Sequence, residues 1–192
     1  MFIELTDHLR CPGDHPEAFL VLLPGRMDGR RVAAGHLGCP YCGWSTSWDG
    51  GPADFGGGRR LDGALSCDAA AAHAMLGIDG PGGWVALVGR AASIAPRLET
   101  LLPHVRIVAI NPPPHLADGG AVSIVTTGTW PIKTHALRGA VVGLDASEWL
   151  PAALASVLPA RHLVGEGTPP ADFHGKLLAT GGGVWVAQAG SA

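Results

Sequence analysis

Two short cysteine-containing segments near the start of the chain have the residue types and spacing of a zinc site. The first holds Cys11 and His15 in a C-x3-H arrangement, and the second is the C-x2-C pair Cys39-Pro-Tyr-Cys42. A C-x2-C turn places two thiolates on one ion, and structural zinc takes four nitrogen or sulfur ligands in a tetrahedron. We therefore predict one Zn2+ ion held by Cys11, His15, Cys39 and Cys42.

The fourth zinc ligand has two alternatives, because Asp14 precedes His15 and His36 lies just before the second pair. For Cys39 and Cys42 the alternative is a redox pair or two buried thiols, but the two half-sites support one another. Two such half-sites joined by a hairpin describe a zinc ribbon. With four protein ligands the predicted metal is structural, and it stabilises a module too small to build its own core.

Length and composition limit what the chain can be. It has 192 residues, 47% of them hydrophobic and 15% charged, so a buried core is feasible and wholesale disorder is excluded. A net charge of −3 excludes a basic nucleic-acid footprint over the whole chain. No apolar run reaches the roughly 18 residues of a membrane span, and the acidic start does not resemble a signal peptide. We expect a cytoplasmic protein without a membrane partner.

Apolar runs that alternate with helical stretches predict an α/β domain after about residue 58. The early runs are short, β-branched and nearly continuous, as in strands buried on both faces of a parallel sheet. Helices are predicted over 92–102 and 147–158, the second with Ser147 as a cap and Pro151 in its first turn. Three glycines separate the last two strands, which predicts a terminal antiparallel hairpin. The predicted strands are 84–88, 105–110, 121–126, 140–144, 162–166, 176–180 and 184–188.

The first segment resembles the short zinc-ribbon proteins that activate methyltransferases acting on tRNA, rRNA and protein release factors. The matching residues are Leu5-Thr-Asp-His-Leu-Arg-Cys11-Pro, Gly38-Cys-Pro-Tyr-Cys-Gly43, and Asp49-Gly with Pro52. The family commonly carries cysteine at both positions of the first knuckle, whereas this chain has His15 one residue later. The resemblance implies a protein partner, either a methyltransferase or a larger assembly.

Residues 61–192 resemble a class I S-adenosylmethionine (SAM)-dependent methyltransferase that has lost much of its signature. The likeness lies in residues 76–89, 130–142 and 150–166 and in the terminal hairpin. Together the two resemblances imply an α/β protein in which a small zinc ribbon precedes a Rossmann-like methyltransferase-type sheet. The glycine- and proline-rich stretch 49–58 divides the chain into a zinc-ribbon domain, 1–57, and a methyltransferase-like domain, 58–192.

The departures from the methyltransferase pattern concern the cofactor pocket. Such enzymes carry an acidic residue on the first strand and a glycine-rich turn after it, where this chain has Leu87 and only Gly89. Asn111 stands where an acidic residue accepts hydrogen bonds from the ribose hydroxyls. Asp145 follows the fourth strand, at the edge where open α/β sheets bind ligands, although a capping or turn carboxylate is the alternative. If SAM is bound at all, the candidate residues are Gly89, Asn111 and Asp145.

Two groups in the first segment are candidate binding surfaces. Arg26, Arg30 and Arg31 form a local basic patch on the predicted hairpin, although residues 1–60 carry six arginines against seven acids. Trp44 and Trp48 would share one face of a strand, where they either cover the core of the ribbon or form an apolar docking patch.

Three functions follow from these observations. The one we favour is a non-catalytic scaffold or regulatory subunit, a pseudoenzyme without catalytic residues that acts through contacts with another protein. The alternative is a SAM-dependent methyltransferase with an atypical cofactor pocket. The third is an RNA-binding zinc-ribbon protein, which the charge balance disfavours.

Overall fold

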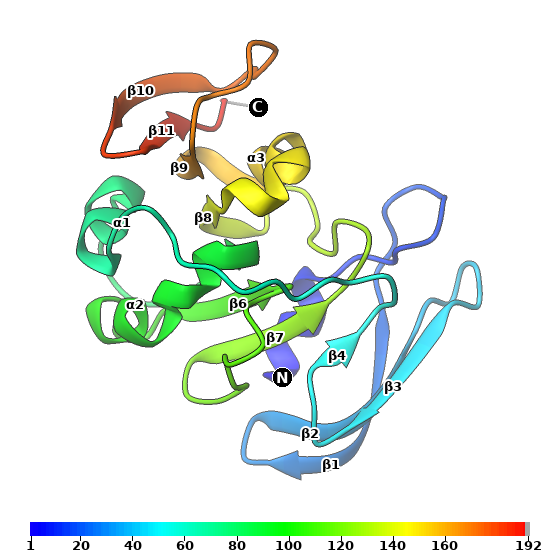
Figure 1. Ribbon diagram of the computed structural model, residues 1–192. Helices are drawn as coiled ribbons and strands as arrows, with labels where there is room; N and C mark the ends of the chain where they lie inside the picture. Colours follow the sequence, from blue (N-terminus) through cyan, green and yellow to red (C-terminus); the bar gives the residue numbers. More distant parts are fainter. Residues whose placement is uncertain (191–192) are drawn as a thin grey trace.

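The computed structural model describes residues 1–190, and it contains a small sheet and a large one (Figure 1). The small sheet is antiparallel, in the order β1-β2-β3, and follows a short 3-10 helix, η1. β1 and β2 form a hairpin, and the loop that contains Cys39 and Cys42 joins β2 to β3. The elements of this part are η1 (Ile3–His8), β1 (Val21–Asp28), β2 (Arg31–Gly38) and β3 (Ser45–Asp49).

The large sheet has eight strands in the order β10-β11-β9-β8-β5-β6-β7-β4. Neighbours from β9 through β4 are parallel, and β11 is antiparallel to both β9 and β10. This is the mostly parallel α/β sheet with a terminal antiparallel hairpin that the sequence predicts. Its strands are β4 (Ala53–Asp54), β5 (Trp84–Val88), β6 (Arg106–Ile110), β7 (Val122–Thr126), β8 (Leu137–Val142), β9 (Val157–Glu166), β10 (Lys176–Gly181) and β11 (Val184–Gln188).

Two strands have boundaries that differ from the prediction by several residues, and a third strand was not predicted. β8 lies at 137–142 rather than 140–144, because the chain turns into a 3-10 helix at Leu144. β9 begins at Val157 instead of His162. A bulge with Ala160 at φ 62° interrupts its pairing with β8. The first part of the strand was not predicted because it contains Pro159, and proline is unusual within a strand. β4 lies in a stretch that the sequence predicts to be turns, and it is only two residues long.

The two predicted helices lie close to their predicted places, and the structure adds a third, α1, that was not predicted. Asp68 caps the first helix by accepting the Ala71 N–H at 2.8 Å, and Gly77 ends it in the left-handed conformation. Pro151 lies in the first turn of α3 as predicted, but Ser147 falls inside the preceding 3-10 helix and caps nothing. The elements are α1 (Ala69–Leu76), η2 (Gly89–Ile94), α2 (Ala95–Leu101), η3 (Leu144–Trp149) and α3 (Leu150–Ser156).

Two hydrophobic cores pack on opposite faces of the large sheet, because alternate residues of each strand point to opposite sides. Helices α1 and α2 cover one face, where Leu76 and Leu98 belong to the same hydrophobic core as Leu87 of β5. The other face is covered by α3 and by the N-terminal part of the chain. Buried side chains of that N-terminal part belong to the same core as β5 and β6: Met1, Leu5, Leu9, Leu37 and Trp48. Within residues 1–190, no helix is long and apolar enough to cross a membrane.

Candidate functional site

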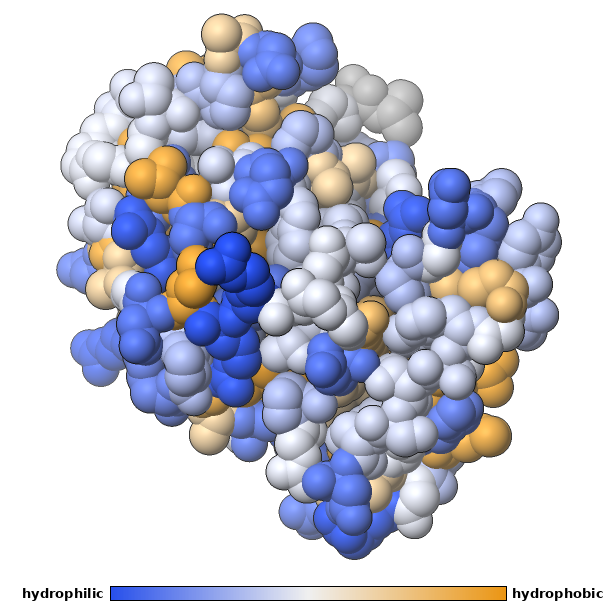
Figure 2. Space-filling model, turned by 45° about the vertical axis from the view of Figure 1, so that its right-hand side comes forward, coloured by the Kyte–Doolittle hydropathy of each residue, from blue (hydrophilic) through white to orange (hydrophobic). Residues whose placement is uncertain are grey.

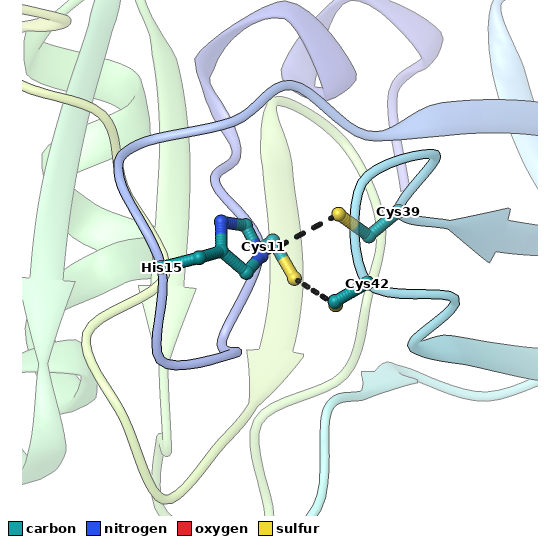
Figure 3. Close-up of side chains that lie close together, drawn as sticks. All are labelled: Cys11, His15, Cys39 and Cys42. Atoms are coloured by element: carbon teal, nitrogen blue, oxygen red, sulfur yellow. Dashed lines mark hydrogen bonds between the residues drawn. The ribbon is translucent and has the colours of Figure 1, made fainter.

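Four side chains from two loops meet beside the small sheet (Figure 3). Cys11 and His15 come from the loop before β1, and Cys39 and Cys42 from the turn between β2 and β3. Their ligand atoms all lie within 4.8 Å of one another, with 3.6 Å between the Cys11 and Cys42 sulfurs and 3.6 Å between His15 Nε2 and Cys39 Sγ. Tetrahedral zinc–thiolate geometry separates neighbouring sulfurs by about 3.7 Å. These four residues could hold a metal ion.

Two glycines allow the loops to come this close. Gly43 follows the last cysteine with φ 75° and donates its N–H to the Cys39 carbonyl at 3.0 Å. At Gly13 a Cβ would lie 3.1 Å from both Cys42 Sγ and the ring of His15, so a side chain there would crowd two of the four ligands. Gly13 also donates its N–H to Cys11 Sγ at 3.3 Å.

The structure brings His15, rather than its two alternatives, to the three cysteines. His15 Nδ1 lies 2.7 Å from the Pro16 carbonyl, which favours a proton on Nδ1 and leaves Nε2 free to ligate. His36 instead lies 2.9 Å from Ser47 Oγ through its Nδ1. Asp14 is outside the group whose ligand atoms converge.

The cysteines of the cluster have opposite ionisation tendencies. Burial opposes ionisation of Cys39, but the N–H groups of Cys42 and Tyr41 outweigh it and lower its pKa to about 7. Burial raises the pKa of Cys11 to about 12, and the neighbouring Cys39 and Cys42 thiols add to this. Three thiolates at these distances would repel one another, and a metal ion among them would supply the compensating positive charge.

The three candidate cofactor residues lie at the carboxyl edge of the large sheet, where each is bound to or packed against other parts of the protein. Gly89, with φ 61°, opens the turn after β5, and a Cβ there would lie 2.5 Å from Asp145 Oδ1. Asp145 accepts the Arg90 backbone N–H with both oxygens at 3.1 Å, so it stabilises the neighbouring turn. The side-chain amide of Asn111 makes two hydrogen bonds with the backbone of Thr127. It donates to the Thr127 carbonyl and accepts from the Thr127 N–H, both at 2.8 Å.

A buried ion pair that sequence reasoning missed lies at the same edge. Glu166, at the end of β9, is 3% exposed and accepts Arg90 Nε–H at 2.6 Å. It also accepts the backbone N–H groups of Ser66 and Leu144 and the Ser66 hydroxyl. Burial alone would raise the pKa of Glu166, but these donors outweigh it and hold the pKa below its usual value. The only indication of this ion pair in the sequence is that Glu166 ends a run of apolar residues.

The segment that joins β4 to α1 crosses the carboxyl ends of the strands (Figure 1). We call residues 56–66 the strap. At Gly58 a Cβ would overlap the Thr127 backbone nitrogen and lie 2.7 Å from Asn111 Oδ1, so the strap is in tight contact there. At Gly63 a Cβ would lie 3.1 Å from the Arg90 side chain. The strap thus contacts the residues that follow β5 and β6.

Arg60 anchors the strap to the loop after β6. Its guanidinium donates to four backbone carbonyls at 2.9–3.2 Å, those of Pro112, Pro113, Pro114 and Leu116. Open α/β sheets bind ligands at this edge, next to the point where the strand order reverses. Here that point lies between β5 and β8, beside Gly89 and Asp145. Asn111, Asp145 and Glu166 at this edge are all hydrogen-bonded to other parts of the protein.

The basic patch predicted on the β1–β2 hairpin is neutralised by carboxylates. Arg26 pairs with Asp49 at 2.7 Å, and Arg30 and Arg31 form ion pairs with Glu4 and Asp118 respectively.

The tryptophans cover the core instead of forming a docking patch. Trp48 is 8% exposed, and Trp44 packs on Phe55 with ring centroids 5.0 Å apart. The large exposed hydrophobic side chains of the N-terminal part lie elsewhere, at Phe19, Val21, Leu23, Met27 and Tyr41. Figure 2 shows hydrophobic residues gathered along the outer margin of the smaller lobe.

The chain matches no family model, and no curated protein matches it significantly. Solved structures of methyltransferases are similar to it. The antibiotic-resistance methyltransferase Kmr is 11% identical over 70% of this chain and 99% of its own, with a TM-score of 0.45. A chain of the complex between the Haloferax volcanii Trm112 methyltransferase activator and a methyltransferase is 15% identical over 50% of each chain, with a TM-score of 0.39. A methyltransferase from Bacillus halodurans is 14% identical over 55% of this chain and 53% of its own, also with a TM-score of 0.39.

These likenesses are distant, since every TM-score is below 0.5, and the chain spans about half the length of the Haloferax and Bacillus chains. The order and direction of its own strands define the class, a methyltransferase-like Rossmann fold. This chain also has a Cys/His cluster that could bind a metal ion and a strap over the carboxyl edge of the sheet.

Proposed function

We propose that this chain is a non-catalytic, zinc-binding protein with a methyltransferase-like fold, and that it acts as a scaffold or regulatory subunit by binding another protein. One observation carries the proposal: the strap is hydrogen-bonded across the carboxyl edge of the sheet, where a cofactor would have to enter. Arg90, whose charge would repel a sulfonium, is held at that edge by Glu166. An enzyme of this fold would need to break these contacts before it could bind its methyl donor.

In this proposal the metal is Zn2+ and its role is structural. Cys11, His15, Cys39 and Cys42 offer three sulfurs and one nitrogen, which fill a tetrahedron and leave no position for a substrate. Residues 1–57 would form the zinc-ribbon domain and residues 58–192 the methyltransferase-like domain. The pairing of β4 with β7 and the shared core would join the two domains.

The partner surface that we propose is the exposed apolar strip of the zinc-ribbon domain. Phe19 and Leu23 are 58% and 61% exposed, and Val21 and Tyr41 are also exposed near the metal cluster. Large exposed apolar side chains that cluster on one face commonly mark a protein contact. The resemblance to methyltransferase activators suggests a methyltransferase or a larger assembly as that partner. Neutralisation of Arg26, Arg30 and Arg31 weighs against RNA.

Calorimetric titration of the zinc-loaded protein with S-adenosylhomocysteine tests the non-catalytic role. We expect no heat of binding, because the strap and the Arg90–Glu166 pair occupy the edge. The Arg60→Ala variant, which loses the four strap anchors, is the matched comparison. Micromolar binding by the native protein would overturn the proposal and support the alternative, a SAM-dependent methyltransferase with an atypical pocket.

The partner surface is tested separately by crosslinking in extracts of the native host. We expect a discrete crosslinked protein with the native chain and with Leu177→Glu, an exposed change on β10. Leu23→Glu should lose it, since a charge would enter the apolar strip. Equal crosslinking by Leu23→Glu would remove this surface from the proposal. An RNA partner that binds with strong salt dependence would replace the protein partner.

A further inference from the structure

A cavity of about 600 Å³ lies beside α3, away from both the metal cluster and the strap. Its walls are α3, the loop from Pro170 to His174, and the chain at Ala189 and Gly190 after β11. Pockets that bind small molecules usually measure about 300–1,000 Å³. The cavity therefore has the size of a ligand site.

The hollow lies beside a crossover that carries no helix, the one from β9 to β10. β10 runs parallel to β9 with β11 between them, and a parallel crossover usually carries a helix over the sheet face. The connections from β5 to β6 and from β8 to β9 carry α2 and α3, but residues 167–175 form only a loop. Phe173 of that loop turns back onto Trp185 of β11, with ring centroids 4.8 Å apart. The cavity lies between this loop and α3.

The lining of the cavity is apolar with a negative rim. Leu150, Leu154, Val157 and Phe173 supply apolar surface. Its charged residues are two carboxylates, Glu148 and Asp172, with no lysine or arginine among the lining residues. Within residues 1–190 neither carboxylate has an ion pair, so both charges are available to a ligand.

A strained residue also lines the cavity. His135 has φ 52°, a left-handed conformation that is uncommon for residues other than glycine, and its N–H bonds to the Ala155 carbonyl at 3.0 Å. Such strain is frequently retained at binding sites. It places an imidazole, which can accept a hydrogen bond when neutral, on the same lining as the two carboxylates.

We propose that this cavity binds a small apolar molecule that carries an amine, with its cationic group facing Glu148 and Asp172 and its apolar body against α3 and Phe173. The two unpaired carboxylates disfavour phosphates, nucleotides and other anions. The site is independent of the proposed function, because it shares no residue with the metal cluster, the strap or the apolar strip.

Two dyes with the same fluorophore and opposite charge test the proposal. Dansylcadaverine is an apolar amine, and dansylglycine is a carboxylate. With the full zinc-loaded chain, we expect dansyl fluorescence to rise and shift to the blue on titration with dansylcadaverine. Dansylglycine should bind about ten-fold more weakly, a difference of about 1.4 kcal/mol. Equal affinity for the two dyes, or binding of neither, overturns the proposal.

Variants test whether the dye binds in this cavity. Ala155→Trp fills it from an exposed position on α3, so the fold should tolerate the change while dansylcadaverine binding is lost. Leu177→Trp, exposed on β10 outside the cavity, is the matched control and should bind as the native chain does. The double variant Glu148→Gln, Asp172→Asn should bind both dyes with similar affinity. Unchanged binding by Ala155→Trp would show that the dye sits elsewhere and would refute the site.

Discussion

Each sulfur of the Cys/His cluster lies close to other ligand atoms of the group, so the loss of one should affect the whole cluster. Cys42→Ser removes the sulfur 3.6 Å from Cys11 Sγ, and we expect most bound zinc to be lost. Cys67→Ser is the matched control, because Cys67 lies outside the group and should leave the zinc content unchanged. Elemental analysis of the purified proteins measures the difference. Equal zinc in the two variants would contradict the assignment of the ligands.

Glu166 should make stability depend on pH. Its pKa is held below the usual value, so the carboxylate contributes stability above the pKa that it has in the unfolded chain. That contribution is lost as the pH falls through the lower pKa of the folded state. We expect Glu166→Gln to lower the free energy of unfolding by about 3 kcal/mol at neutral pH, because Arg90 loses its buried partner.

The check on Glu166 is denaturant unfolding of both proteins from neutral pH down to about pH 3, well below the usual glutamate pKa of about 4.3. The native protein should lose stability more steeply than Glu166→Gln at the acid end of this range. Parallel curves would mean that the carboxylate does not titrate with folding.

Among the elements, the strap has the least internal structure and the most specific contacts. Gly58→Ala would place a Cβ against the Thr127 backbone and 2.7 Å from Asn111 Oδ1, so the strap must shift outward. We expect faster hydrogen exchange over residues 58–66 and a loss of about 1–3 kcal/mol. Gly51→Ala is the control, since its Cβ would meet nothing within 4 Å. Unchanged exchange in Gly58→Ala would show that the strap is not held at this point.

The sequence predicts the strands of the large sheet well, because β5, β6 and β7 are short apolar runs, buried almost throughout. It predicts the Cys/His cluster for a similar reason: a ligand pair within a few residues is a local signal. The strap has no such signal. Its position depends on Asn111 and on the loop after β6, which lie some fifty residues further along the chain.

The polar contacts of the carboxyl edge could not be predicted from the sequence either, because they join residues that are far apart along the chain. Arg90 and Glu166 are 76 residues apart, and only the fold brings them together. Asp145 was expected either at a cofactor or as a cap, yet it accepts the N–H of Arg90 across the edge. Local patterns place elements, whereas pairings between distant polar residues require the tertiary structure.

At the scale of the whole molecule, the shared core predicts that metal loss affects both sheets. Leu5, Leu9 and Trp48 pack in one core with β5 and β6, so the N-terminal part cannot unfold without exposing a face of the large sheet. We expect one calorimetric transition for the zinc-loaded protein, shifted to lower temperature as a whole by a zinc chelator. The chelator should have no further effect on Cys42→Ser. Two separate transitions, with the later one insensitive to the chelator, would contradict this coupling.

The shared core has a consequence for the lifetime of the protein in a cell. A metal-free chain would present the apolar face of its main sheet, which chaperones and proteases recognise in partly unfolded proteins. Its abundance would then follow zinc supply after synthesis, with no sensor or transcriptional control needed. With the zinc site proposed above, cells starved of zinc would clear this protein faster than cells supplied with it.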